Sequence, residues 1–464
     1  MIVPLFLLYL LHLGSAGFLG PDEPRYASIG REMAQSGDFV TPHLNGAAWF
    51  EKPPLLYWLT AVATKVGLRD EWAARVPGAL ASLGFLLFFF ATLEREFSAK
   101  VAMMGTAILG TSAGWIAYSY GAVPDVLMSA LFGAALLVTL FDTRPGRGYL
   151  AGALLGLAML AKAFVPLVLI APVWLIARGK RIPMIVSAVA VAVPWHLWCY
   201  WRNGPAFWHE YFWVQQVGRF FTPERQHVQP WWYYVPVLLA GLFPWTPLVA
   251  LLFRRKVLND FRVRSLLVWI GIGLVFFSAA QNKLPGYLLP LLPAAAIVLA
   301  VALDRAPRAE WWIAGCALLL LLLPSIASGL PEALRASVSK SHWTWQLGWI
   351  EGIFIVAAAG GAWWAAWKGQ KPEGVLVAAL AMAAVLGVLE SSTLAALDER
   401  YSVRAFWQEH SAEVEGACLD SSVSRTWKYG LEYYAGRELL DCGNPPLPGV
   451  QIVTREGALA AERP

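Results

Sequence analysis

Charged residues are scarce in this sequence of 464 residues: Asp, Glu, Lys and Arg make up only 14% of it, while hydrophobic residues make up 58%. Soluble globular domains typically contain about 25% charged residues, so this composition excludes a soluble fold of this length. The sequence also contains 24 Trp, a residue that is enriched where membranes meet water. We therefore expect an all-α polytopic membrane protein.

Cysteine is scarce too, and the four cysteines at positions 199, 316, 418 and 442 lack the paired spacing of a metal site. Cys199 and Cys316 lie in apolar segments, where a thiol usually packs as a small hydrophobic group. Cys418 and Cys442 could form a disulfide outside the cytosol or remain as thiols in the core of a small domain. The formal net charge of +5 does not indicate nucleic-acid binding, because the basic residues fall mostly in short links between apolar runs.

About thirteen apolar runs are predicted to span the membrane. The first covers residues 2–17 and lacks the basic start of a signal peptide, so we interpret it as a retained helix. Several runs are shorter than the roughly 20 residues that a bilayer requires, and we expect these to be tilted or broken. The other runs cover residues 72–94, 101–118, 124–141, 149–161, 164–177, 182–200, 231–253, 265–280, 285–303, 311–328, 347–367 and 374–395.

Lys and Arg are concentrated in every second link between these runs. The basic links cover residues 95–100, 144–147, 178–181, 254–264, 305–308 and 368–371. Among the opposite short links, residues 119–123 contain no Lys or Arg, and two others contain only Lys162 or only Lys283. By the positive-inside rule the basic links are cytoplasmic, which places the N-terminus inside and the C-terminus outside.

This topology places the polar residues most suited to chemistry on the outer face. They are Asp22, Glu23, Glu51 and Lys52 in the first outer loop (residues 18–71), and Asp125, Lys162, Arg219, Arg225, His227, Lys283 and Tyr287 in later links. Each also has an ordinary structural explanation. Asp125 could cap a helix, the Lys and Arg side chains could anchor at the interface, His227 could be a plain loop residue, and Tyr26 and Tyr287 could belong to an aromatic belt. Their convergence on one face favours an active site.

The first outer loop is predicted to contain two amphipathic helices, at residues 25–37 and 54–66, that frame a cavity at the membrane surface. Its motifs, in their order along the chain, resemble those of the ArnT-like glycosyltransferases, and the resemblance covers about residues 1–303. This family belongs to the GT-C superfamily, which also includes protein O-mannosyltransferases. The matching motifs are Asp22-Glu23-Pro24-Arg25-Tyr26-Ala27, Phe50-Glu51-Lys52-Pro53, Val123-Pro124-Asp125, Arg219-Phe220, His227 and Lys283-Leu284-Pro285-Gly286-Tyr287.

The resemblance implies an enzyme that transfers a hexose or pentose, with inversion, from a polyprenyl phosphate to a lipid or glycan acceptor such as lipid A. Asp22 would be the catalytic carboxylate and Asp125 would assist it. The lipid phosphate would be bound by Lys52, Arg219, Arg225 and Lys283, together with Tyr287 and Tyr26. Glu51 and His227 could hold a divalent cation (zinc, magnesium or manganese), which the chemistry does not require, and no nucleotide is implied.

Two other functions fit parts of the pattern. A protein O-mannosyltransferase-like enzyme would share the fold. A polyprenyl-lipid flippase would also need many spans, but it should have ionisable residues near the membrane midplane and internal repeats, and the sequence indicates neither.

The composition changes near residue 398, so we predict a membrane domain at 1–397 and a small outer α/β domain at 398–464. In this second domain we expect helices at 401–410 and 426–436 and strands at 416–420, 438–442 and 451–454. The resemblance implies a multi-pass protein of a bacterial-type inner membrane, and it indicates that this domain is shorter than the equivalent region of most relatives.

Overall fold

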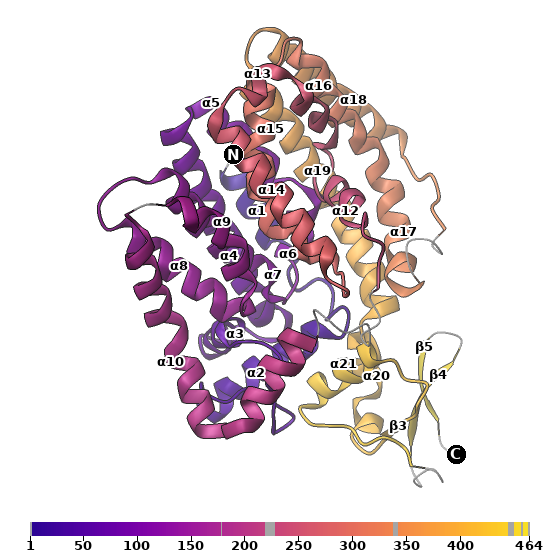
Figure 1. Ribbon diagram of the computed structural model, residues 1–464. Helices are drawn as coiled ribbons and strands as arrows, with labels where there is room; N and C mark the ends of the chain where they lie inside the picture. The colour runs from indigo at the N-terminus through magenta and orange to yellow at the C-terminus, as the bar shows by residue number, and fades with distance from the viewer. Residues whose placement is uncertain are drawn as a thin grey trace.

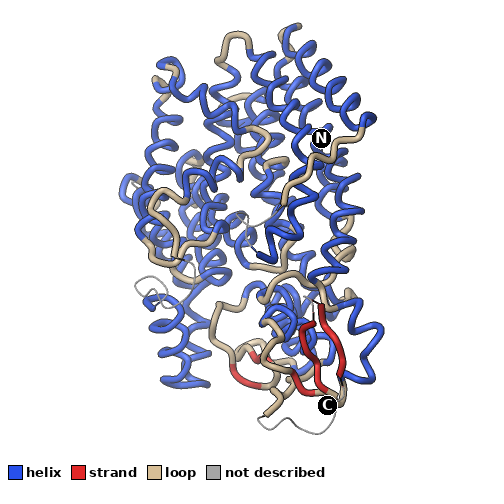
Figure 2. Tube along the Cα trace, turned by 90° about the vertical axis from the view of Figure 1, so that its right-hand side faces the viewer, coloured by secondary structure: helices blue, strands red, loops and turns tan. Residues whose placement is uncertain are grey.

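The computed structural model describes residues 2–177, 179–218, 228–336, 342–443, 450–455 and 458–462. Helices form one elongated body, and a small domain containing β-strands lies at one end of it (Figure 1). The view in Figure 2 shows the strands gathered near the C-terminus at that same end. The mostly helical body agrees with the predicted helical membrane protein, whereas a separate outer α/β domain at 398–464 stays a prediction.

The described part of the chain contains eight helical stretches that are long and apolar enough to cross a membrane, or up to ten if two bent pairs each count as one span. The eight stretches are built from α4 (Asp70–Glu96), α7 (Pro124–Phe141), α10 (Arg181–Trp208) with η1 (His209–Gly218), α14 (Phe261–Ala279), η3 (Pro285–Leu291) with α15 (Leu292–Asp304), α16 (Ala309–Leu318) with η4 (Leu319–Leu322) and α17 (Leu323–Ala336), α18 (Trp349–Trp367), and α19 (Lys371–Tyr401) with α20 (Arg404–Val414).

The two bent pairs correspond to the predicted runs 101–118 and 231–253. The first joins α5 (Ala99–Gly110) to α6 (Ala113–Ser119) with a bend of 60°, and the second joins α12 (Tyr234–Gly241) to η2 (Thr246–Phe253) with a bend of 113°. At the first bend the hydroxyls of Thr111 and Ser112 donate to the carbonyls of Ala107 and Ile108, each at 2.6 Å. These bonds satisfy polar groups where the helix is interrupted inside an apolar body.

Three further predicted runs form α1 (Ile2–Leu10), α8 (Arg147–Lys162) and α9 (Val165–Ile176), which have 9, 16 and 12 residues. All three are shorter than the roughly 20 residues of a spanning helix. The thirteen apolar runs therefore all appear as helical segments, but a count of thirteen spans stays a prediction.

The centre of the helical body is formed by η3 with α15 and by α7, because 94% and 78% of the residues in their apolar stretches are buried. The helices around them pack closely. A side chain at Gly152 of α8 would place its Cβ only 2.1 Å from the carbonyl oxygen of Met184 in α10, so glycine lets these two backbones approach. α8 also packs against α7, so the two helices that carry Lys162 and Asp125 lie side by side.

Both helices predicted in the first outer loop are present, as α2 (Asp22–Ser36) and α3 (Leu55–Lys65). A short hairpin of β1 (His43–Leu44) and β2 (Ala47–Ala48) lies between them in the sequence. Gly37 ends α2 with a left-handed conformation (φ 73°) that suits glycine. α2 is not a helix lying freely on the membrane, because most of its first half is buried against α3, α4 and the C-terminal domain.

The small domain at the C-terminal end contains α20, β3 (Cys418–Leu419), α21 (Arg425–Ala435), β4 (Gln451–Arg455) and β5 (Ala458–Glu462). We call it the outer module, after the side of the membrane on which the sequence predicts it to lie. Its three strands are ordered β3-β4-β5, with β3 parallel and β5 antiparallel to β4. Cys418 and Cys442 form a disulfide, whereas Cys199 and Cys316 are free and buried.

The structure corrects three details of the predicted module. Residues 438–442 form only one bridge, from Leu419 to Asp441, instead of a strand. The first helix begins at Arg404, because Tyr401 still belongs to the end of α19. β5 was not predicted, since its sequence Ala-Leu-Ala-Ala-Glu contains no β-branched or aromatic residue.

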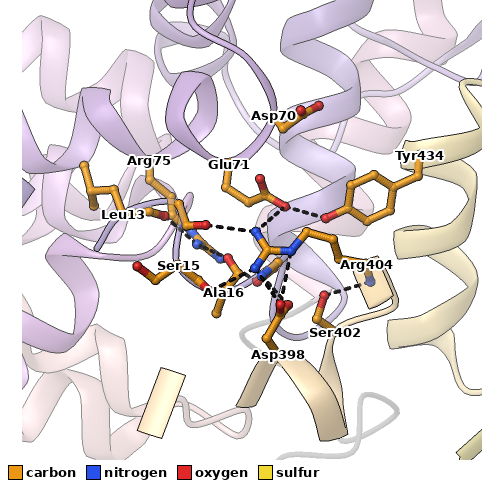
Figure 3. A network of polar contacts seen from close by, with 12 residues as sticks. Leu13, Ser15, Ala16, Asp70, Glu71, Arg75, Asp398, Ser402, Arg404 and Tyr434 are labelled. Carbon is orange, nitrogen blue, oxygen red and sulfur yellow. Dashed lines mark hydrogen bonds and ion pairs between the residues drawn. The ribbon is translucent and has the colours of Figure 1, made fainter. Parts of the chain in front are cut away.

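The outer module is docked onto the beginning of α4 by the polar network in Figure 3. Arg404 donates to Asp398 Oδ2 at 2.5 Å and to the carbonyls of Gly14 and Ser15, both at 2.9 Å. The hydroxyl of Tyr434 donates to Glu71, as the figure shows. The contacts of Arg404 and Tyr434 thus join residues near the two ends of the sequence.

We predict that Arg404→Leu loosens this docking by about 1 to 3 kcal/mol, because Asp398 and two carbonyls lose a largely buried charged donor. The measurement is the rate of limited proteolysis after residue 398 in the purified membrane protein. Arg455→Leu is the matched control, because its pair with Glu462 is exposed and its loss should leave the rate of proteolysis unchanged. Equal proteolysis of the two variants would contradict the prediction.

Candidate active site

A cavity of about 280 Å³ lies where α2, α7, α8, η1 and η3 meet. Its wall combines acidic, basic and neutral polar side chains with an apolar side. The polar lining residues are Asp22 and Tyr26 of α2, Lys52, Tyr118 of α6, Asp125 of α7, Lys162 of α8, Gln215 and Gln216 of η1, Asn282, and Tyr287 of η3. The apolar side includes Val165, Phe276 and Phe277. Residues 265 positions apart in the sequence, such as Asp22 and Tyr287, therefore share one cavity.

Arg25 links the carboxylates beside this cavity. Its Nη1 donates to Glu51 Oε2 at 2.9 Å, its Nη2 donates to Asp22 Oδ1, and its Nε donates to the Pro21 carbonyl at 3.0 Å. Burial alone would lower the pKa of this guanidinium, but Glu51, Tyr26 and Asp22 raise the pKa above its ordinary value. Arg25 therefore stays charged and fixes the direction of both carboxylates.

Asp22 is the first residue of α2, and 48% of its side-chain surface is exposed although its partner Arg25 is buried. A carboxylate at a helix N-terminus is stabilised by the free backbone N–H groups there. Asp22 thus has a fixed orientation and access to the cavity. A side chain that exchanges a proton with a bound molecule needs both properties.

Asp125 forms an ion pair with Lys162, with Oδ1 and Nζ 2.5 Å apart. The Lys162 ammonium also lies 4.8 Å from the centre of the Tyr287 ring. The prediction that Asp125 only caps a helix is not supported: Val123 occupies the N-cap position of α7, and no side-chain capping bond is formed there. The pair adds a second carboxylate to the cavity lining, besides Asp22 of α2.

Glu23, the neighbour of Asp22, forms a buried clamp with Arg75 of α4. Arg75 donates to both carboxylate oxygens, at 3.1 and 2.8 Å. The same carboxylate accepts from the backbone N–H groups of Leu19 and Ala122, both at 2.7 Å. The remaining Arg75 donors bind the carbonyls of Leu13, Ala16 and Gly17 at 2.7, 2.7 and 2.9 Å. Since Ala122 lies three residues before Asp125, the clamp holds the segments of both cavity acids.

Two buried tyrosines lie beneath these groups. Burial raises the pKa of Tyr26 and of Tyr57 well above the ordinary value, and the negative charge of Glu51 adds to both shifts. Tyr26 therefore stays protonated, and its hydroxyl donates a weak hydrogen bond to Glu51 Oε1, at 3.5 Å. This fits its predicted part as a neutral donor at the cavity.

The structure brings together Asp22, Tyr26, Lys52, Asp125 and Tyr287 of the predicted site residues, but it places Lys283 differently. The Lys283 ammonium donates to the carbonyls of Ala280 and Gln229, at 2.7 and 3.1 Å. Its neighbours Asn282 and Leu284 line the cavity, whereas Lys283 is not among the lining residues described. The geometry therefore does not support Lys283 as a phosphate ligand, because its charge is already solvated by backbone.

Arg219, Arg225 and His227 lie outside the described residues, so their predicted contacts stay predictions. The carboxylate of Glu51, the other predicted metal ligand, contacts Arg25 and also Lys52, whose Nζ lies 3.3 Å from Oε1. Within the described ranges no three His, Cys, Asp or Glu side chains are grouped so that they could hold a metal ion. The described residues alone do not fit a metal site, and we derive no step through one.

Sequence reasoning did not include Arg25, Gln215 or Asn282 among the site residues. Arg25 could have been found, because it lies within the Asp-Glu-Pro-Arg motif, three residues after Asp22 on the same helix. Gln215 and Asn282 carried no such signal, since neutral amides in links are common and only the fold places these two at the cavity.

The sequence matches a family model described as dolichyl-phosphate-mannose-protein mannosyltransferase over residues 51–200. It is also 33% identical over 353 residues to the undecaprenyl phosphate-alpha-4-amino-4-deoxy-L-arabinose arabinosyl transferase of Enterobacter sp. (strain 638), covering 68% of this chain and 63% of that relative. A relative with the same description from Pectobacterium atrosepticum is 35% identical over 346 residues, covering 68% of this chain and 59% of its own length. The chain thus spans less than two thirds of the length of these relatives.

Solved structures show the same fold. ArnT from Cupriavidus metallidurans bound to undecaprenyl phosphate matches with a TM-score of 0.73 and 23% identity, covering 95% of this chain and 85% of the other. The same protein in the apo state matches with a TM-score of 0.75 and 21% identity, covering 97% and 91%.

We predict that Glu23→Gln destabilises the protein by about 3 to 5 kcal/mol, because it leaves the buried Arg75 charge without its counter-charge. Thermal unfolding of the purified protein in detergent measures this loss. Glu96→Gln is the control, because Glu96 pairs with a largely exposed Arg95 and should change stability by less than about 1 kcal/mol. If both variants unfold at the wild-type temperature, the Glu23–Arg75 ion pair does not stabilise the protein by the predicted amount.

Proposed function

Because the chain belongs to the ArnT-like family of GT-C membrane glycosyltransferases, we propose that it transfers a sugar from a polyprenyl phosphate to a lipid or glycan acceptor such as lipid A. The observation that carries this proposal is the cavity that gathers Asp22, Lys52 and Asp125 from separate parts of the chain. The names of the relatives support undecaprenyl phosphate as the carrier and an aminopentose as the sugar.

The donor phosphate would bind at Lys52, whose side chain is mostly buried at 14% exposure and lines the cavity. A phosphate oxygen accepts a charge-assisted hydrogen bond from an ammonium, and the protonated Tyr26 hydroxyl can add a neutral donor. The apolar side with Val165, Phe276 and Phe277 is suited to the first isoprene units of the lipid. The resemblance adds Arg219 and Arg225 as further cations for the phosphate.

In the transfer itself, the bond from the anomeric carbon to the phosphate oxygen breaks, and its electron pair leaves with the polyprenyl phosphate. The acceptor oxygen forms the new bond from the opposite face, which inverts the anomeric configuration. If the acceptor is a hydroxyl, Asp22 takes its proton, a contribution of about 10² to 10⁴ in rate. If the acceptor is an ionised phosphate, Asp22 orients it instead, and Asp125, held by Lys162, positions the acceptor.

We place the cavity at the outer face of the inner membrane. The basic links expected in the cytoplasm, near α5, α13 (Arg255–Leu258) and α16, lie at the end of the molecule opposite to α2 and the outer module (Figure 1). This separation supports a cytoplasmic N-terminus and an outer C-terminus.

A protein O-mannosyltransferase-like activity is the second candidate, and the family model that matches residues 51–200 favours it. Both enzymes would use a polyprenyl or dolichyl phosphate donor. Only the acceptor differs, so incubation of one labelled donor with either lipid A or a Ser/Thr-rich protein separates them.

We predict that Asp22→Asn lowers sugar transfer at least 100-fold while the affinity for sugar-free undecaprenyl phosphate stays within twofold of wild type. Transfer is measured with purified enzyme in nanodiscs, and affinity by native mass spectrometry. Asp441→Asn, at a mostly exposed carboxylate of the outer module, should retain full turnover. Unchanged turnover in Asp22→Asn would exclude this residue as the catalytic carboxylate.

A further prediction concerns Lys52→Met, which should weaken binding of sugar-free undecaprenyl phosphate about 10- to 150-fold through loss of a charged hydrogen bond. The same titration applied to Lys65→Met provides the control. Lys65 lies in the same loop but contacts the Phe39 ring, and it is not among the described cavity residues. Equal affinities for the two variants would refute Lys52 as a phosphate ligand.

A further inference from the structure

The outer module places one of its side chains against the residue that orients Asp22. The ring centre of Tyr429, in α21, lies 5.1 Å from the guanidinium carbon of Arg25. Arg25 is 5% exposed and binds both Asp22 and Glu51. We propose that Tyr429 is a positioning residue of the active site, which makes the outer module a working part of the transferase. This inference rests on the proposed function.

Arg25 needs such support because its planar guanidinium must direct separate N–H groups to two different carboxylates. Three aromatic rings surround it: Tyr26 and Trp49 from the first outer loop, each at 5.8 Å, and Tyr429 from the module at 5.1 Å. A cation held over aromatic faces is attracted to them, most strongly where water is excluded. Of these rings Tyr429 is the nearest, and it belongs to a different domain.

Contacts of α21 before and after Tyr429 in the sequence hold the helix that carries this ring. Arg425, four residues earlier on the same helix, has its guanidinium 5.8 Å from the Tyr429 ring. Further along the helix, the carbonyl of Tyr433 accepts from Arg31 of α2 at 2.7 Å. Glu432 accepts from the Asn45 side chain at 3.1 Å. The first bond holds α21 on α2 and the second holds it on the turn between β1 and β2, so the ring is presented to Arg25 in a defined position.

The residues that dock the outer module, Arg404 and Tyr434, differ from Tyr429, which contacts Arg25 beside the cavity. Arg404 and Tyr434 bind the start of α4 (Figure 3), whereas Tyr429 touches Arg25. A loss of docking and a loss of positioning can therefore be measured separately, with different substitutions in the same full-length protein.

The test compares Tyr429→Leu with Tyr429→Phe in nanodiscs, using an undecaprenyl phosphate-linked aminopentose as donor and lipid A as acceptor. The leucine variant should lower kcat about 3- to 30-fold while the donor KM and the affinity for sugar-free undecaprenyl phosphate stay within twofold. The phenylalanine variant keeps the ring and should retain wild-type kcat. Tyr434→Phe removes a docking hydrogen bond and should lower thermal stability without lowering kcat.

A double-mutant cycle with Arg25→Lys makes the result specific to this contact. Adding Tyr429→Leu to Arg25→Lys should cause no further loss of kcat, because the guanidinium that the ring positions is already absent. Wild-type kcat in Tyr429→Leu, an equal loss in Tyr429→Phe, or fully additive effects in the cycle would each overturn the inference. Absence of transfer by the wild-type enzyme to any acceptor, with donor lipid still bound, would overturn the proposed function itself.

Discussion

The buried ion pair of Glu23 and Arg75 is the interaction on which the outer end of the molecule depends. Removing two charges from water is costly, and the cost is offset only when every donor and acceptor finds a partner. Here the partners are backbone groups of the segment after α1, of the α2 entry and of the link before α7. The same bonds that satisfy the charges therefore fix the relative positions of the segments that carry Asp22 and Asp125.

The fold and much of the site could be predicted, because they depend on local or strongly patterned signals. The helices around Asp22 and Tyr57 followed from apolar periodicity, and the common face followed from the distribution of Lys and Arg. Lys283 was assigned to the phosphate because it is a cation within a motif that resembles the family, but only the tertiary structure shows that two carbonyls accept from its ammonium. A break was expected in short runs such as 101–118, which is bent. The bend in the longer run 231–253 was not foreseen, since a run of hydrophobic residues has the same composition whether it is straight or broken.

The cavity balances its charges in two local groups. On one side Arg25 neutralises Asp22 and shares Glu51 with Lys52; on the other, Lys162 neutralises Asp125. Such pairing offsets the cost of placing carboxylates next to an apolar wall, where an isolated charge would be too costly. An incoming anionic headgroup would therefore meet cations already held in position, with little reorganisation required before reaction.

The docking of the outer module also has a consequence for biogenesis. Asn45 and Glu432, which contact each other, are separated by 387 residues, and Gly14 and Arg404 by 390. During synthesis the ribosome must therefore reach residue 432 before the surface around α2 can receive its cover. Until α20 and α21 have been made, the polar groups of Asn45 and Gly14 stay without these partners, so this part of the fold can only be completed late in synthesis.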